Sequence, residues 1–119
     1  MELSLSSTVV DGIPVIGVAG EVDVSSSAAL RDRLADVLDT GDGTAVVDLT
    51  DVTFLDSTGL GTLVGAFKRA EERGGSLPIV CPHERILKLF RITGLDTVFT
   101  IRDAVPAAVA AATERPAAS

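Results

Sequence analysis

The sequence predicts a single α/β domain whose sheet is mixed, mostly parallel, with about five strands covered by about four helices. Three observations lead to this fold class. An Asp-Gly dipeptide between two apolar runs near the start indicates an antiparallel hairpin. After it, strand-like apolar runs alternate with amphipathic segments, which is typical of parallel strands joined by crossover helices. The length of 119 residues allows one domain with a sizeable core and is too short for two ordinary ones.

The hairpin joins a first strand, in which Leu3 and Leu5 alternate with polar residues, to a second strand over 13–19. Residues 25–27 are serines that can cap a first helix. Gly41 stands where a helix commonly ends in a left-handed residue. The apolar residues of this helix share one face: Leu30, Leu34, Val37 and Leu38.

The run TAVVDLT over 44–50 is rich in β-branched residues and predicts a buried third strand. A second helix follows, because the apolar spacing changes to i, i+3, i+4 and i+7. It closes at Gly74 and Gly75. The apolar face comprises Leu60, Leu63, Val64 and Phe67.

Two further strand and helix pairs complete the predicted fold. A fourth strand over 77–81 contains Pro78, which donates nothing to a ladder, so the strand starts late or bulges there. A helix over 84–93 stops at Gly94, and a fifth strand covers 98–101. The last helix, from Val105 to Ala112, tolerates a proline in its first turn. Residues 113–119 are expected to form a flexible tail.

Composition excludes several classes of function. The net charge of −7 disfavours nucleic acid and anionic membranes as direct partners, and the four Phe with no Trp or Tyr leave few stacking platforms. The start of the chain lacks signal-peptide character and no run is long enough to span a bilayer, so we expect a cytoplasmic protein. Cys81 and His83 match no zinc spacing, and we expect no metal and no cofactor.

The most informative segment is DSTGLG, from Asp56 to Gly61, placed between a strand-like run and a helix. Asp56 or Ser57 can act as N-cap, and Ser57 then lies at a solvent-facing helix tip, where free N–H groups suit a phosphate. Gly59, Gly61 and Gly65 each cost about 1 kcal/mol relative to Ala in a helix. Two compatible reasons can place them there: close packing of helix on sheet, or a low surface that another protein's active site can reach.

The chain resembles a known family at this point. The stretches VVDLTDVTFLDSTGLGTLVGAFKRA and ERILKLFRITGLDTVF, with GEVD over 20–23 before the first helix, are similar to those of the bacterial anti-sigma factor antagonists, which have the STAS fold. The resemblance covers about residues 1–112, which we assign to a single STAS domain.

The resemblance implies a protein switch without catalysis of its own. Ser57 corresponds to the serine that an anti-sigma factor serine kinase phosphorylates with ATP bound by the kinase. The unmodified antagonist binds this kinase and frees the sigma factor, and a serine phosphatase restores the phosphorylated form. A monomer is expected. The implied partner-binding residues are Glu21, Asp23, Asp56, Ser57, Thr58, Gly59, Leu60 and Gly61.

Other interpretations stay open. The chain can be a STAS adaptor or scaffold in another signalling or transport complex, with Ser57 only a helix cap. Asp23 can simply cap a turn. The apolar excess on the helix over 84–93 can be a second surface or core. A hydrolase with Ser57 as nucleophile and His83 as base is disfavoured because no nucleophile-elbow motif is present. An NTPase loop lacks its lysine.

Overall fold

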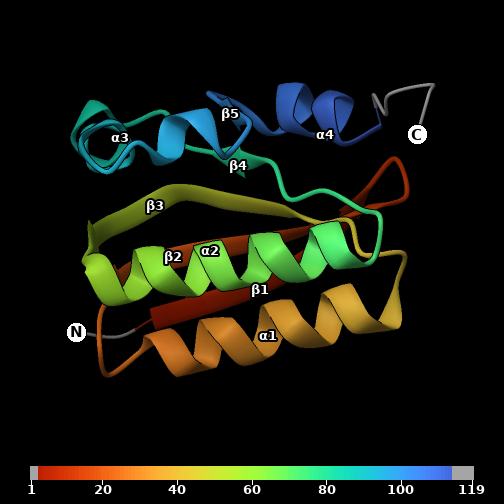
Figure 1. Ribbon diagram of the computed structural model, residues 1–119, viewed down its shortest axis with the longest axis horizontal. Coiled ribbons are helices and arrows are strands. Elements are labelled where there is room, and N and C mark those ends of the chain that lie inside the picture. The colour runs from red at the N-terminus through yellow and green to blue at the C-terminus, as the bar shows by residue number, and fades with distance from the viewer. Residues whose placement is uncertain (1–2, 114–119) are drawn as a thin grey trace.

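The computed structural model describes residues 3–113 and contains one five-stranded sheet with strand order β1-β2-β3-β4-β5 (Figure 1). β1 pairs with β2 antiparallel, and the other neighbours are parallel. The predicted fold class is confirmed. In chain order the elements are β1 (Leu3–Val10), β2 (Ile13–Val22), α1 (Ser27–Thr40), β3 (Val46–Leu55), α2 (Ser57–Glu72), β4 (Ile79–Val80), α3 (Glu84–Ile92), the 3-10 helix η1 (Leu95–Thr97), β5 (Ile101–Arg102) and α4 (Val105–Thr113).

The strand residues alternate between two apolar clusters on the two faces of the sheet. Ile16, Val47 and Ile79 belong to the larger cluster, which also holds the buried side chains of α1, α2 and α3. The preceding or following residues Val15, Val46 and Val80 belong to a smaller cluster under α4. Both faces of the sheet centre are therefore buried, which explains why its strands are continuous apolar runs.

The hairpin prediction is confirmed in detail. Val10 pairs with Ile13, and the two turn residues between them have positive φ, +51° at Asp11 and +79° at Gly12. This is the geometry of a two-residue type I′ turn, whose twist matches that of the flanking strands.

The second and third strands are longer than predicted. β2 extends to Val22 and β3 to Leu55, and the two pair in parallel to their ends, with register shifts after Gly17 and Gly20. The extension of β3 could not be recognised from the sequence because Asp51, Thr53 and Phe54 in its second half are solvent-exposed and interrupt the apolar pattern. The strand thus continues up to the residue before the DSTGLG motif.

The fourth and fifth strands are short. β4 starts late, as Pro78 suggested, and the Pro78 carbonyl accepts a hydrogen bond from Val47 N–H at 3.0 Å. The prediction of a strand over 98–101 is wrong: β5 is Ile101–Arg102, and η1 precedes it. Phe99 explains the difference, because its ring packs edge-to-face on Phe67 and Phe90 and is buried there.

Three features of the helices refine the predictions. Gly41 ends α1 with φ −111°, so no left-handed residue is needed there; the positive φ falls at Gly43 instead. Most of the apolar excess on α3 is core, since Ile86 and Phe90 are buried and only Ile92 is largely exposed. The predicted last helix is confirmed, and it includes residue 113 of the predicted tail. Residues 114–119 lie outside the described residues.

Candidate functional site

The ends of β2 and β3 lie side by side and bring the predicted site residues together. Glu21 pairs with Phe54, and Val22 pairs with Leu55. One residue later the Asp56 N–H donates to the Val22 carbonyl at 3.3 Å. Glu21 and Asp23 are therefore held beside the start of α2.

Asp56 is the N-cap of α2, and this settles the choice that the sequence left open. Its Oδ1 accepts a hydrogen bond from Gly59 N–H at 3.0 Å, and its carbonyl accepts one from Leu60 N–H at 3.0 Å. Ser57 is the first helical residue and is exposed. Within residues 3–113, neither the Ser57 hydroxyl nor the N–H groups of Ser57 and Thr58 have a hydrogen-bond partner. The serine is thus a free hydroxyl at a helix N-terminus.

The three glycines of α2 have different surroundings. A Cβ on Gly59 would lie 2.5 Å from Leu55 Cδ1, 2.7 Å from Val22 Cγ1 and 3.1 Å from the Val22 carbonyl oxygen, so this glycine permits close packing of helix on sheet. A Cβ on Gly61 or Gly65 would meet nothing within 4 Å. Close packing therefore accounts for Gly59, whereas Gly61 and Gly65 leave a low surface whose use by another protein stays a prediction.

A surface hollow of about 330 Å³ lies between α1 and α2 and begins one residue after Ser57. Asp39 of α1 and Arg69 of α2 link the two helices through bidentate hydrogen bonds of 2.9 and 2.8 Å. Gly61, Gly65 and Ala66 of α2 contribute little side-chain volume along it. Its lining comprises Arg31, Ala35, Thr58, Gly61, Thr62, Gly65, Ala66 and Arg69.

Asp23 organises the turn between β2 and α1. Its Oδ1 accepts hydrogen bonds from the hydroxyl and N–H of Ser25 at 2.8 and 3.0 Å, and from the hydroxyl and N–H of Ser26 at 3.1 Å each. The Ser25 hydroxyl contributes most to holding the pKa of Asp23 below its ordinary value. The turn-capping interpretation is confirmed, while a role of Asp23 in partner binding stays a prediction.

Two exposed apolar side chains near the site were missed by the sequence analysis. Val24, in the turn after β2, is 76% exposed, and Phe54, one residue before the end of β3, is 46% exposed. Phe54 breaks the spacing of its buried neighbours Val52 and Leu55, which was the available signal. Large contiguous apolar patches mark protein-binding surfaces, whereas single exposed apolar side chains are common, so a contact role for Val24 and Phe54 stays a proposal.

The geometry gives no support to a Ser57 and His83 hydrolase. His83 Nε2 is hydrogen-bonded to the Thr50 carbonyl oxygen, and Arg85 Nη2 donates to the Thr53 carbonyl at 3.1 Å. The hollow of about 500 Å³ that His83 lines does not include Ser57. Burial raises the pKa of the Cys81 thiol. Over the described part of the chain, no three His, Cys, Asp or Glu side chains gather as a metal site.

Comparison with known proteins identifies the family. The STAS domain family model matches residues 4–108. The chain belongs to the STAS domain family. The anti-sigma-B factor antagonist of Bacillus subtilis (strain 168) is 42% identical to it over 86 residues, which cover 72% of this chain and 78% of that protein. This STAS protein therefore belongs among the anti-sigma factor antagonists.

Solved structures agree with this assignment. A crystal structure of an anti-sigma factor antagonist from Mycobacterium paratuberculosis superimposes with a TM-score of 0.87 and 25% identity, covering 95% of this chain and 96% of that one. The Bacillus cell fate determinant SpoIIAA, solved in its phosphorylated form, shares the fold with a TM-score of 0.69 and 22% identity, covering 92% of this chain and 98% of that one. Within residues 3–113, no helix of the STAS protein is long and apolar enough to cross a membrane.

Proposed function

We propose that this STAS protein is an anti-sigma factor antagonist whose binding to an anti-sigma factor serine kinase is switched off by phosphorylation of Ser57. The proposal rests on the separate roles of two neighbouring residues at the start of α2. Asp56 caps the helix, and the neighbouring Ser57 hydroxyl is exposed and unpaired within the described residues. Ser57 can therefore be modified without removing a contact on which the fold depends.

A phosphoryl group on Ser57 has favourable surroundings within the chain. The unpaired N–H groups of Ser57 and Thr58 point from the helix N-terminus, where an anion is stabilised by about 0.3–1 kcal/mol when exposed. The fold is known to accept a phosphoryl group in SpoIIAA. The modified protein is expected to stay folded, so phosphorylation acts on binding and not on stability.

The effect on the partner is electrostatic. Phosphorylation adds roughly 1.5 to 2 negative charges to a tip that already carries Asp56 and, on the neighbouring strand end, Glu21 and Asp23. This charge must be desolvated or is repelled at a packed interface. If the binding free energy becomes less favourable by on the order of 3 kcal/mol, the affinity falls about a hundredfold. That change suffices for a switch.

The kinase supplies the chemistry. The γ-phosphoryl group of its ATP is transferred to Ser57 Oγ, the serine proton is released, and ADP is the other product. A serine phosphatase reverses the modification by hydrolysis. The unmodified protein occupies the anti-sigma factor and releases the sigma factor, with Val24 and Phe54 as apolar contacts around Ser57.

The test compares four proteins, the wild type, Ser57→Ala, Ser57→Asp and the neighbouring control Thr58→Ala, against the cognate kinase. Intact-mass analysis is expected to show one phosphoryl group on the wild type and on Thr58→Ala and none on Ser57→Ala. Calorimetry is expected to show that Ser57→Ala binds like the unmodified wild type and that Ser57→Asp binds about a hundredfold more weakly. Equal affinities of Ser57→Ala and Ser57→Asp would contradict the switch.

The adaptor alternative assigned Ser57 a capping role, which Asp56 performs in the structure. A stable complex with a protein that is not a kinase, together with an unmodified Ser57 in the native cell, would nevertheless favour an adaptor.

A further inference from the structure

The two edges of the sheet differ in how they are protected. At one edge β5 has only two residues, and the second of them is the charged Arg102. At the other edge β1 has eight residues, LSLSSTVV, with no charge and no proline. Its pairing with β2 is free of bulges. Proteins commonly protect an exposed edge with charges, prolines, bulges or short strands, and β1 has none of these features.

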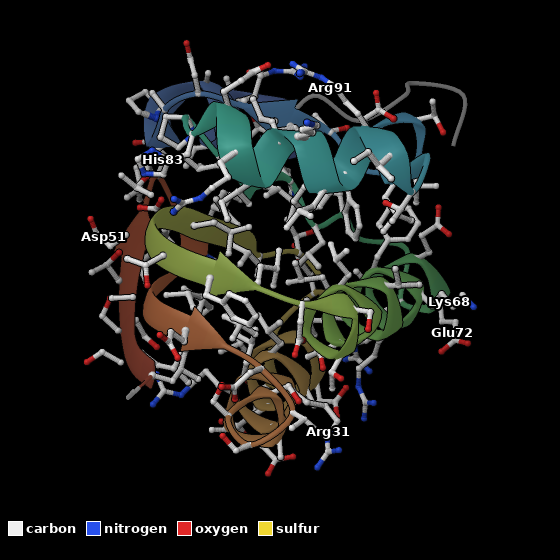
Figure 2. All side chains as sticks on the ribbon, turned by 90° about the vertical axis from the view of Figure 1, so that its left-hand side faces the viewer. Arg31, Asp51, Lys68, Glu72, His83 and Arg91 are labelled. Atoms are coloured by element: carbon white, nitrogen blue, oxygen red, sulfur yellow. The ribbon has the colours of Figure 1, made fainter. Side chains whose placement is uncertain are left out.

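The outer edge of β1 is open in the described structure. Figure 2 shows β1 at the left margin of the ribbon with no other element beyond it. Among residues 3–113, the one hydrogen bond that a β1 side chain makes with a residue outside the hairpin is that from Arg33 Nη1 to Ser7 Oγ at 2.9 Å. The backbone of β1 is therefore available to a further strand.

The hairpin determines which backbone groups face outward. A two-residue turn closes on a hydrogen-bonded pair, here Val10 and Ile13. Hydrogen-bonded and non-hydrogen-bonded pairs then alternate along an antiparallel ladder. The N–H and C=O groups that point away from β2 are consequently those of Leu3, Leu5, Ser7 and Val9.

We propose that β1 pairs antiparallel with β1 of a second copy of this chain, joining the two sheets into one. One register uses all the outward groups: Leu3 lies opposite Val9 of the second copy, and Leu5 lies opposite its Ser7. The two-fold axis then passes between the two Ser6 residues, which form a non-hydrogen-bonded pair. A second copy is the fitting occupant because this pattern is complementary to itself.

The side chains support this register. Val9 is 70% exposed, although Leu3 and Leu5 on the same face pack against the main core. The pairing covers each Val9 with the Leu3 of the other copy, at both ends of the contact between the two β1 strands (the seam). β1 has no charged residue, so the pairing places no like charges opposite one another. The whole chains, at −7 each, repel one another, so the dimer is expected to tighten as salt screens that charge.

The contact is small. One pair of strand edges buries less surface than the ~1,200–2,000 Å² of stable interfaces, so the dimer is expected to form at micromolar concentrations. The seam contains no residue of the Ser57 site, so the dimer and the phosphorylation switch can succeed or fail independently. This proposal differs from the monomer expected from the sequence, and sedimentation decides between them.

Sedimentation velocity on the full chain, from about 10 to about 500 μM, tests the proposal over the range expected for so small a contact. The wild type is expected to shift from monomer to dimer, more readily at high salt. Val9→Lys places a charge opposite Leu3 and is expected to raise the dissociation constant at least about tenfold. The matched control Val9→Thr keeps a β-branched residue and is expected to dimerise as the wild type does. A chain that stays monomeric throughout would overturn the proposal.

Cysteine cross-linking tests the register. The Cα atoms of the two Ser6 residues are expected about 4.5 Å apart, within the range of a disulfide. Ser6→Cys is therefore expected to give a covalent dimer under mild oxidation, whereas Thr8→Cys, which faces Ser4 of the other copy, is not. The native Cys81 is buried and does not interfere. Cross-linking of Thr8→Cys equal to that of Ser6→Cys would exclude this register, whatever the fold stability of either variant.

Discussion

Gly59 and Gly61 are two residues apart in α2, and they lie on opposite sides of its first turn. Gly59 faces the sheet, where an added Cβ would collide with the side chains of Leu55 and Val22 and make a tight contact with the Val22 carbonyl oxygen. Gly61 faces solvent and the hollow beside α1, where an added Cβ would meet nothing. The same residue type thus serves packing on the inner side of the turn and leaves a low surface on the outer side, next to Ser57.

The largest change in stability is expected for a substitution on the side of α2 that faces the sheet. Gly59→Ala is expected to lower the free energy of unfolding by roughly 1–3 kcal/mol, because the helix must move away from a backbone atom and two buried side chains. Urea unfolding followed by circular dichroism measures this. A Gly59→Ala protein as stable as the wild type would show that the helix tip can move freely and that inner and outer sides do not differ.

The cap predicts the next effect. Asp56→Ala is expected to lower the free energy of unfolding by about 1 kcal/mol, because the Gly59 N–H loses its acceptor. Ser57→Ala is the matched control and is expected to change stability by less than about 0.5 kcal/mol, since no contact depends on the hydroxyl. Thermal unfolding of both variants checks the assignment, and a larger loss for Ser57→Ala would mean that Ser57 is the cap.

A gain in stability is expected for a substitution on the side of α2 that faces solvent. Gly61→Ala is expected to raise the free energy of unfolding by about 0.5–1 kcal/mol, because alanine restricts the unfolded chain and the added methyl group has room. The same variant is expected to bind the kinase more weakly if the hollow receives the partner. Paired urea unfolding and calorimetry on Gly61→Ala measure both effects. Destabilisation would show that the outer side is constrained too.

The smallest expected effect is the pH dependence of the turn beside α2. The lowered pKa of Asp23 means that the folded protein favours the ionised carboxylate. Its stabilising contribution is fully present above the unfolded pKa of about 3.9 and is lost as the pH falls through the lower folded pKa. The stability difference between wild type and Asp23→Asn is therefore expected to shrink on acidification from pH 6 to about pH 3, as measured by urea unfolding. A difference independent of pH would contradict this role of the charge.

Much of the fold could be predicted because local rules agree with the tertiary structure. The Asp11 and Gly12 turn has the positive φ values of the predicted hairpin. On the predicted apolar face of α2, Leu60 and Leu63 are buried, and Val64 and Phe67 pack partly buried against the core. The errors fell where tertiary contacts compete with the local pattern. Asp51, Thr53 and Phe54 of β3 are exposed, yet the strand pairs with β2 as far as Leu55, and Phe99 is held by two other rings instead of a strand.

The site was predictable in composition but not in the roles of its residues. The DSTGLG motif located the hydroxyl at a helix start, but either Asp56 or Ser57 could be the cap. Phe54 could be suspected only from its position between the buried residues Val52 and Leu55. Val24 could not be recognised as exposed, because an apolar residue near a strand end is usually buried and exposure depends on which face of the sheet is covered.

The sequence by itself determined the fold class, the hairpin and the position of Ser57 at a helix tip, because turn chemistry, apolar periodicity and capping act over a few neighbouring residues. Only the tertiary structure decided that Asp56 is the cap and Ser57 the exposed hydroxyl. It also decided the opposite surroundings of Gly59 and Gly61 and the open edge of β1. These features depend on which atoms distant segments bring within contact distance, and neither periodicity nor spacing along the chain encodes that distance.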